Sequence, residues 1–107
     1  MRGDVLKSHL ELLVLTALEA GPGHGYSIIR GIRDRSGGEF EVHEGSLYPV
    51  LHRLERDGLV SSSWSEVGGR RRRVYQLRAK GRAALEEQRG NWRRFERAMN
   101  SILASGA

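Results

Sequence analysis

Four consecutive arginines, Arg70, Arg71, Arg72 and Arg73, directly follow the pair Gly68-Gly69. Each guanidinium can hold a phosphate through two parallel N–H···O bonds, and such contacts provide much of the affinity of proteins for nucleic acids. The bland alternative is a solvated charge run on the surface. We favour phosphate binding because the flanking segments predict a β-hairpin, with the four side chains at its tip, that directly follows the outline of a helix-turn-helix.

A second set of polar side chains belongs to a helix predicted to begin near Ser46. Its apolar residues recur at helical spacing and must face inward, which turns the others outward. The inward residues are Leu47, Val50, Leu51 and Leu54, and the outward ones are Ser46, Pro49, His52, Arg53 and Arg56, with Tyr48 at the edge. A recognition helix presents hydrogen-bonding groups to base edges in this way. Acidic neighbours moderate its charge, so we expect it to read bases or orient the protein.

A third pattern lies near the C-terminus, where large apolar residues recur at alternating steps of three and four. They are Leu85, Trp92, Phe95, Met99 and Ile102, with one polar interruption at Gln88. The simplest interpretation is a coiled-coil-like dimerisation seam. Because large aromatic side chains pack poorly in a regular seam, they could instead wall a cleft for a planar aromatic ligand.

The sequence contains none of the catalytic motifs for which we searched. It has no cysteine, and its four histidines lack the spacing of a zinc protease site. There is no Gly-x-Ser-x-Gly elbow, and the glycine-rich segment from Gly21 to Gly25 lacks the Gly-Lys-Ser/Thr of a phosphate-binding loop. We therefore expect no catalysis, no metal and no cofactor.

Length and composition point to one small domain that needs a partner. The chain has 107 residues, of which only 38% are hydrophobic, and a formal net charge of +5. A chain of this size buries a modest share of its surface, so we expect a second subunit to complete the core. The charge is uneven: residues 1–69 carry a net −3 and residues 70–107 a net +8. No apolar run approaches the about 20 residues of a membrane span, and no signal peptide is evident, which predicts a cytoplasmic protein.

The N-terminal half predicts three helices. After a polar arm at 1–7, Ser8 and Glu11 have the spacing of a capping box that begins a buried helix over about 9–20. A second helix is expected over 24–36, and a short edge strand over 39–43. The second helix would turn four residues inward, namely Tyr26, Ile28, Ile29 and Ile32. The third would have Ser46 as its N-cap and Pro49 in its first turn.

The C-terminal half changes from strand to helix. Segments 59–66 and 71–77 flank a turn at 67–70 and predict a hairpin. A helix follows over about 79–104, in which Gly81 and Gly90 each cost about 1 kcal/mol relative to alanine. Three short helices, the last two joined by a turn, outline a helix-turn-helix, and the hairpin directly follows it.

Three stretches of the sequence resemble a known family. The first is His24-Gly25-Tyr26, the second runs from Glu44 to Val60 and contains Gly-Ser-Leu-Tyr-Pro-Val-Leu, and the third is Gly69 to Leu77 together with Gly81. Together they span roughly residues 8–82 and resemble the PadR family of bacterial transcriptional regulators. The resemblance implies a recognition helix at about 46–56, a wing at about 61–77, a homodimer held by the C-terminal helix, and repression of nearby genes relieved by a small molecule.

Two departures from the family pattern stand out. The usual Leu-Thr-x-Lys-Gly at the end of the wing is Leu77-Arg78-Ala79-Lys80-Gly81, so the threonine cap of the last helix is missing. The frequent Lys-Tyr-Tyr of the wing is Arg73-Val74-Tyr75, which keeps the charge.

The prediction is an α+β winged helix-turn-helix over 1–78 with a dimerisation helix over 79–107. It would act as a DNA-binding regulator, most simply a repressor released by a small aromatic or hydrophobic effector. The expected DNA-binding residues are Tyr26, Ser46, Tyr48, Pro49, His52, Arg53, Arg70, Arg71, Arg72 and Arg73, and the expected dimer and effector residues are Leu85, Trp92, Phe95, Met99 and Ile102. The rival hypothesis is a basic adaptor that binds RNA or an acidic protein surface without operator specificity.

Overall fold

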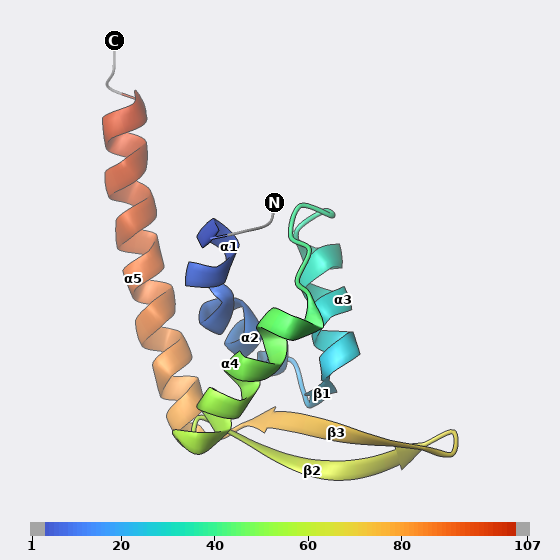
Figure 1. The fold of residues 1–107 in the computed structure, drawn as a ribbon. Helices are drawn as coiled ribbons and strands as arrows, with labels where there is room; N and C mark the ends of the chain where they lie inside the picture. The colour runs from blue at the N-terminus through green and yellow to red at the C-terminus, as the bar shows by residue number, and fades with distance from the viewer. Residues whose placement is uncertain (1–3, 105–107) are drawn as a thin grey trace.

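The computed structural model describes residues 4–104 and, within them, five helices and a three-stranded antiparallel sheet (Figure 1). The elements in order are α1 (Asp4–Ser8), α2 (Leu10–Glu19), β1 (Gly23–His24), α3 (Gly25–Arg35), α4 (Glu44–Arg56), β2 (Val60–Val67), β3 (Arg70–Leu77) and α5 (Ala79–Ala104). The first four helices lie on one side of the sheet, and α5 rises from the base of the hairpin (Figure 1). The predicted α+β winged-helix architecture is confirmed.

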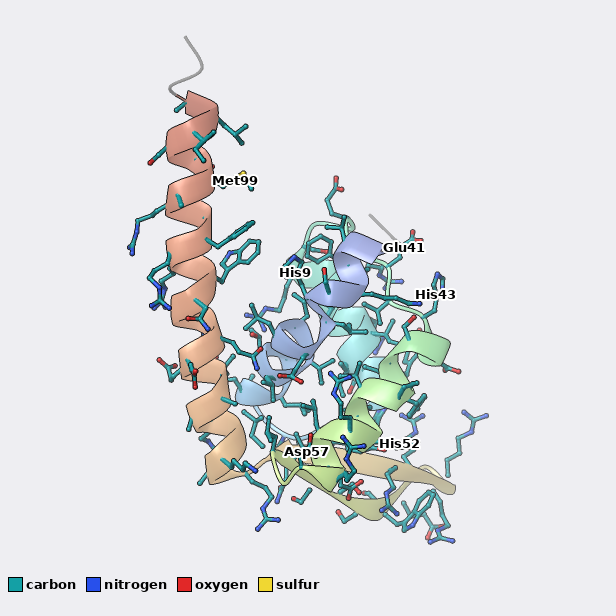
Figure 2. The ribbon with its side chains drawn as sticks, turned by 60° about the vertical axis from the view of Figure 1, so that its left-hand side comes forward. His9, Glu41, His43, His52, Asp57 and Met99 are labelled. Carbon is teal, nitrogen blue, oxygen red and sulfur yellow. The ribbon has the colours of Figure 1, made fainter. Side chains whose placement is uncertain are left out.

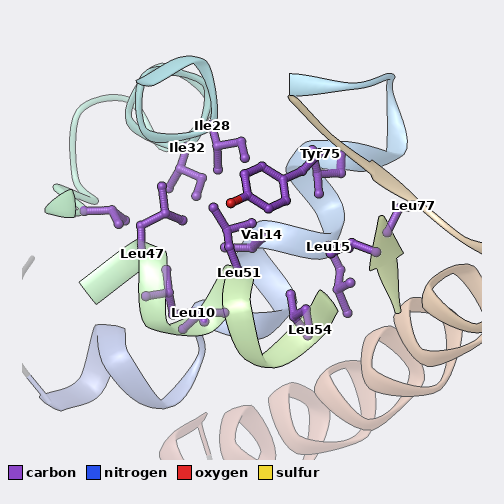
Figure 3. Packing of buried hydrophobic residues seen from close by; sticks show 14 of the residues in the cluster. Leu10, Val14, Leu15, Ile28, Ile32, Leu47, Leu51, Leu54, Tyr75 and Leu77 are labelled. Carbon is purple, nitrogen blue, oxygen red and sulfur yellow. The ribbon is translucent and has the colours of Figure 1, made fainter. Parts of the chain in front are cut away.

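The core lies where α2, α3 and α4 meet β3 (Figure 3). Val14, Leu15, Leu47 and Leu51 are completely buried, and Tyr75 closes the layer from the sheet. The inward face predicted for α4 is therefore confirmed, and α2 is buried on the side that carries Val14 and Leu15. Each buried leucine side chain of this kind contributes about 1.5–3 kcal/mol through removal of its apolar surface from water.

On α3, one inward residue was predicted wrongly. Ile28 and Ile32 are buried, but Tyr26 is 56% exposed. Two residues correspond to about 200° around a helix, so Tyr26 lies nearly opposite Ile28. The Arg30 guanidinium lies over its ring at 5.2 Å.

The N-terminus also differs from the prediction. Residues 1–3 of the expected polar arm lie outside the described part of the chain, whereas 4–8 form α1, with Leu6 buried. The Ser8–Glu11 capping box does not form, because Ser8 Oγ donates instead to the Val5 carbonyl at 2.9 Å. The His9 amide donates to the Leu6 carbonyl, and the N-cap of α2 is His9 rather than Ser8, with no side-chain cap.

The third strand is not the one predicted. Residues 39–43 form a loop that inserts Val42 into the core, and α3 ends before Gly37 and Gly38, both with positive φ. The sheet has the order β1-β3-β2, in which Gly23 pairs with Tyr75 and His24 with Val74. A two-residue strand has no alternation of its own to detect, so its pairing depends on the tertiary fold.

The predicted hairpin is confirmed, with a tighter turn. Val67 pairs with Arg70, which leaves Gly68 and Gly69 as the two turn residues at φ +60° and +77°. A two-residue turn with positive φ at both positions matches the twist of the strands and favours glycine. We call β2, this turn and β3 the wing.

Helix α5 begins at Ala79 although the family threonine is absent. The Leu59 carbonyl accepts the Arg78 amide at 3.0 Å, and Gly81 passes so close that a Cβ there would lie 2.1 Å from the same oxygen. The glycine that weakens the helix is thus needed for this close approach. Among the described residues, no helix is long and apolar enough to cross a membrane.

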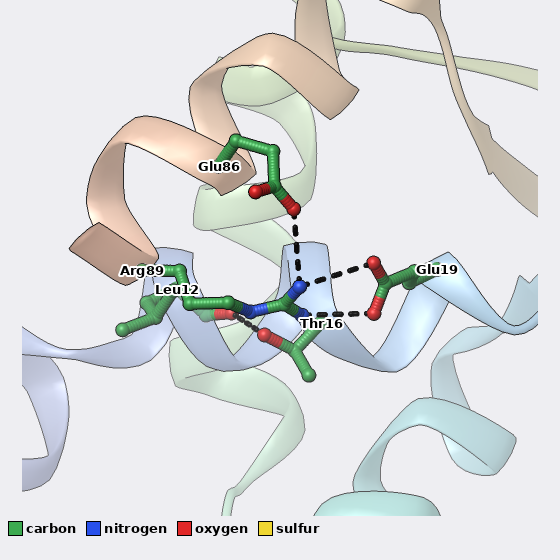
Figure 4. A network of polar contacts seen from close by, with 5 residues as sticks. All are labelled: Leu12, Thr16, Glu19, Glu86 and Arg89. Carbon is green, nitrogen blue, oxygen red and sulfur yellow. Dashed lines mark hydrogen bonds and ion pairs between the residues drawn. The ribbon is translucent and has the colours of Figure 1, made fainter. Parts of the chain in front are cut away.

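The N-terminal part of α5 packs on α2 through Leu85, which is buried, and through polar contacts around it. Arg89 contacts Glu19 at 2.8 Å and Glu86 at 3.2 Å, beside a Thr16 hydroxyl that donates to the Leu12 carbonyl (Figure 4). The hydrogen bonds from Arg89 hold the pKa of Glu19 below its usual value. Beyond this contact, residues 91–104, which we call the distal half of α5, are exposed.

Candidate nucleic-acid interface

A groove of about 830 Å³ separates α4 from the wing. We call it the recognition groove. It is lined by His24, Gly25, Tyr26, Glu44, Tyr48, His52, Glu55, Trp64, Arg70, Arg71, Arg72, Arg73 and Tyr75. Figure 2 shows His52 projecting from α4 on the side of the wing. The structure therefore brings together most of the residues that the sequence suggested for DNA binding.

The start of α4 lies earlier than predicted. The helix begins at Glu44 with His43 as its N-cap, so Ser46 is inside the first turn and Pro49 is in the second. Proline at that position offers no N–H to the Gly45 carbonyl. Because Gly45 and Pro49 are both exposed, water or a bound partner can supply the missing hydrogen bond.

The floor of the recognition groove depends on a glycine. A Cβ at Gly25 would lie 2.2 Å from Tyr48 Oη, so the tyrosine lies directly on the backbone at the start of α3. His52 lies one turn further along α4, with its ring centre 6.3 Å from that of Tyr48. The aromatic pair forms the α4 wall of the groove.

Two predicted residues lie on the other flank of α4. Arg53 Nη2 pairs with Glu11 Oε1 at 3.1 Å, and Ser46 borders a small pocket beside Leu6 and Lys7. Neither lines the recognition groove. The outward half of a helix is about 180° wide, and only the packing of α1 and α2 decides which flank is free.

The four wing arginines are not equivalent, because successive residues of a strand point to opposite faces. Arg71 and Arg73 share the face of Trp64, whose ring they cover at 4.7 and 5.2 Å. On the other face, Arg72 Nη1 lies 2.8 Å from His24 Nε2. Three of the four guanidinium groups predicted near the hairpin tip thus have a partner within the chain.

Arg73 also ties the wing to α4. Its Nε donates to Ser62 Oγ at 2.9 Å, and the Ser62 hydroxyl donates to the Glu55 carboxylate. Arg73 Nη2 lies 3.9 Å from the same carboxylate. This network compensates part of the negative charge that Glu55 brings to the recognition groove.

His24 links α3 to the wing. Its Nδ1 accepts the Ser27 amide at 3.4 Å, and the His24 amide donates to Ser27 Oγ at 3.0 Å, which forms the capping box of α3. Burial lowers the pKa of His24, and the charges of Arg72 and Arg30 lower it further. Both ring nitrogens thus face donors, an arrangement that disfavours the protonated imidazolium.

Four residues of this site were not predicted from the sequence, and they are Trp64, Glu55, Ser62 and His24. The position of Trp64 could have been predicted from the strand register. A two-residue turn at Gly68-Gly69 places residue 64 directly opposite residue 73, as observed. The remaining contacts depend on the distance between α4 and the wing, which local patterns do not encode.

The predicted seam of α5 divides into two parts. Leu85 is 1% exposed within the core of its own chain, so its assignment to a dimer or effector surface was wrong. Trp92, Phe95, Met99 and Ile102 are 38–70% exposed. Figure 2 shows Met99 pointing from α5 toward the side of the molecule on which His9 lies.

A second pocket, of about 420 Å³, lies beside Trp92. The Trp92 ring meets His9 edge-on at 5.1 Å and Phe95 at 5.6 Å. Its lining combines these rings with polar groups of α2, α4 and α5, and comprises Ser8, His9, Glu11, Leu12, Arg53, Gln88, Asn91, Trp92 and Phe95. We call it the Trp92 pocket. The wall opposite Trp92 includes His9 of the same chain.

The helices, the wing and the recognition groove define a winged helix-turn-helix protein. Residues 14–87 match the transcriptional regulator PadR-like family, and the chain belongs to that family. Its members are transcriptional regulators rather than enzymes.

Individual relatives agree with this assignment. The chain is 56% identical over 50 residues to the transcriptional regulator Rv3488 of Mycobacterium tuberculosis, a match that covers 47% of each protein. The crystal structure of a PadR family transcription regulator from Clostridium difficile is 33% identical and has a TM-score of 0.79, with 89% of this chain and 98% of that one covered. Bacillus subtilis PadR, solved in complex with operator DNA, shares the fold at 22% identity and a TM-score of 0.67, over 74% of this chain and 45% of that one.

Proposed function

We propose that the protein binds double-stranded DNA through the recognition groove and regulates transcription. The observation that carries this proposal is the convergence of the α4 wall and the arginine-rich wing on one groove. The shared fold of Bacillus subtilis PadR, which was solved with operator DNA, supports it. In this proposal residues 1–78 form the DNA-binding unit and 79–107 the dimerisation helix, and the protein acts in the cytoplasm.

The two walls have different tasks. Tyr48, Pro49 and His52 lie at or beside the exposed side of α4 and would meet base edges in the major groove. Arg70, next to the turn, and Arg71 and Arg72 would hold phosphates. Tyr26 borders the groove from α3 and would contact the backbone. Ser46 and Arg53 lie on the other flank of α4, outside this groove.

The wing is tested by salt dependence. The Arg71→Ala/Arg72→Ala variant should bind specific and random duplexes more weakly, and the log–log slope of affinity against salt should fall by about 0.9 per lost phosphate contact. The matched control is Arg93→Ala/Arg97→Ala, which removes the same charge from α5 and should leave the slope nearly unchanged. Equal slopes in wild type and the wing variant would exclude the wing from phosphate binding.

Base readout separates this proposal from the basic adaptor. A His52→Ala change should cost about 1–3 kcal/mol at one base position if a well-formed base contact is lost. An adaptor that contacts only the backbone would be indifferent to base order. A footprint on the DNA upstream of the protein's own gene provides the sequence for this measurement.

We further propose a homodimer that uses the distal half of α5, whose exposed apolar residues favour burial against a second copy. Two recognition helices about 34–36 Å apart would then match successive major-groove half-sites. Binding at a promoter in this way would exclude other proteins, so repression is the simplest outcome.

The Trp92 pocket is the proposed effector site. Its flat rings suit a small aromatic compound, and its place between α2, α4 and α5 would let a ligand change the spacing of the recognition helices. Planar aromatic compounds should quench Trp92 emission in a Trp64→Phe background. They should also weaken operator binding, and operator DNA should weaken the binding of the compound by the same factor. Unchanged emission, or equal ligand binding with and without operator, would leave the pocket a packing feature.

A further inference from the structure

Trp64 lies on the outer half of the wing and exposes 56% of its surface. Its partner across the hairpin is Arg73, and Arg71 occupies the diagonal position on the same face. Both guanidinium groups lie over the indole, at 4.7 Å for Arg71 and 5.2 Å for Arg73. The ring thus organises two of the four wing arginines.

The two arginines are held differently. Arg73 donates through Nε to Ser62, and its Nη2 lies 3.9 Å from the Glu55 carboxylate on α4, so part of its guanidinium already faces partners in the chain. For Arg71, the indole is the contact that the described part of the chain provides. A guanidinium stacked over a ring keeps its five N–H donors at its own edges, where they remain available to a phosphate. Stacking therefore fixes the position of Arg71 without using its hydrogen-bonding capacity.

A continuous set of contacts connects this ring to the recognition helix. Trp64 contacts Arg73, Arg73 contacts Ser62, and Ser62 contacts Glu55 on α4. The tip of the hairpin extends past the helices, beyond the part of β3 that pairs with β1 (Figure 1). The set of contacts therefore fixes the outer wing relative to α4, across the recognition groove.

We propose that Trp64 is a positioning residue of the DNA-binding site: it holds Arg71 at a fixed place opposite α4, so that wing and helix meet the duplex together. This inference rests on the proposed function. Preorganisation reduces the conformational entropy lost when a long side chain binds. Cation–π contacts at exposed sites correspond to about two- to fivefold each in an equilibrium constant.

The test compares Trp64→Phe, which keeps an aromatic face, with Trp64→Leu, which keeps an apolar side chain but no ring. The leucine variant should lose up to about fivefold in duplex affinity, the upper limit for one such contact, whereas the phenylalanine variant should stay within about twofold of wild type. Adding Trp64→Leu to Arg71→Gln should cause little further loss, because the ring acts through that arginine. Ser63→Ala, on the opposite face of β2, is the matched control and should bind as wild type.

A second measurement needs no DNA. The side-chain δ protons of Arg71 and Arg73 should show ring-current shifts in the NMR spectrum of wild type and of Trp64→Phe, and lose them in Trp64→Leu. Thermal unfolding of each variant shows whether it is folded, and the phenylalanine variant keeps the test decisive if the leucine variant is not.

The outcomes separate the two proposals. If wild type binds no duplex while the ring-current shifts are present, the proposed function fails and the stacked arrangement stands as structure only. If wild type binds and Trp64→Leu binds equally well, the positioning role alone is overturned. Equal losses in the leucine and phenylalanine variants, or additive losses with Arg71→Gln, would also overturn it, because the indole would then act on the DNA itself.

Discussion

The exposed fraction of the apolar residues differs strongly between the region 4–85 and the distal half of α5. In the first region Val14, Leu15 and Leu51 are fully enclosed, whereas Phe95 is 52% exposed and Ile102 70%. The first region closes its core within one chain. The low apolar content suggested that a partner completes the core, but the region 4–85 needs none for this. The exposed apolar residues lie on the protruding part of α5, and an isolated helix of this length would be marginal in water.

The largest expected effect comes from a charge on the exposed seam. Phe95→Glu should weaken self-association by roughly 3–5 kcal/mol, because the dimer would bury an unpaired carboxylate. Sedimentation should show monomer, and operator affinity should fall with the loss of the second half-site. Because the region 4–85 has its own core, circular dichroism should still show a folded chain.

Ser101→Glu places the same charge on the other side of α5 and serves as the control. It should remain as associated as wild type. A dimeric Phe95→Glu variant that binds DNA normally would place the subunit interface on another surface.

Leu85→Ala is expected to act on the enclosed core of the region 4–85. Since Leu85 is buried within its own chain, the change should lower the free energy of unfolding by about 2–5 kcal/mol. Chemical denaturation should give the same loss at low and high protein concentration. Leu103→Ala, a change of the same size at a position 70% exposed, should leave the monomer's stability nearly unaltered. A loss that depends on protein concentration would return Leu85 to the dimer seam.

Local patterns predicted the fold best where a residue's role is set by its own helix or turn. The inward leucines of α4 and the Gly68-Gly69 turn are of this kind. Some errors fall where distant segments decide. β1 exists only by pairing with β3, and Leu85 is buried because α2 lies against it.

The site shows the same division. The wing arginines and the outward face of α4 were predictable from spacing, and both border the recognition groove. The spacing could not predict which flank of α4 is covered by other helices. Arg53 was therefore expected to contact DNA, although it pairs with Glu11. The Glu55–Ser62–Arg73 network likewise requires the distance between helix and hairpin, which no single segment specifies.

Gly81→Ala tests the junction between the two regions. The added methyl would lie 2.1 Å from the Leu59 carbonyl oxygen, and that oxygen is backbone, so the start of α5 must shift. We expect a net loss of about 1–3 kcal/mol in stability, as for other overpacked sites, despite the gain in helix propensity. Gly90→Ala is the control, because a Cβ there meets nothing within 4 Å. It should stabilise α5, and a similar gain at Gly81 would show that the junction can relax.

The smallest expected effect is a pH dependence within the enclosed region. The pKa of His24 is lowered by burial and by Arg72 and Arg30, so below about pH 6.5 the unfolded chain takes up a proton that the folded chain resists. The stability that His24 contributes is therefore complete above this pH and declines as the pH falls. His24→Asn keeps a good helix cap for α3 but cannot titrate. The stability difference between wild type and His24→Asn should accordingly shift in favour of the variant between pH 7.5 and 5.5, measured by urea denaturation. A difference that is constant over this range would show that the folded ring accepts a proton as readily as the unfolded one, and that its contact with Arg72 does not constrain its charge.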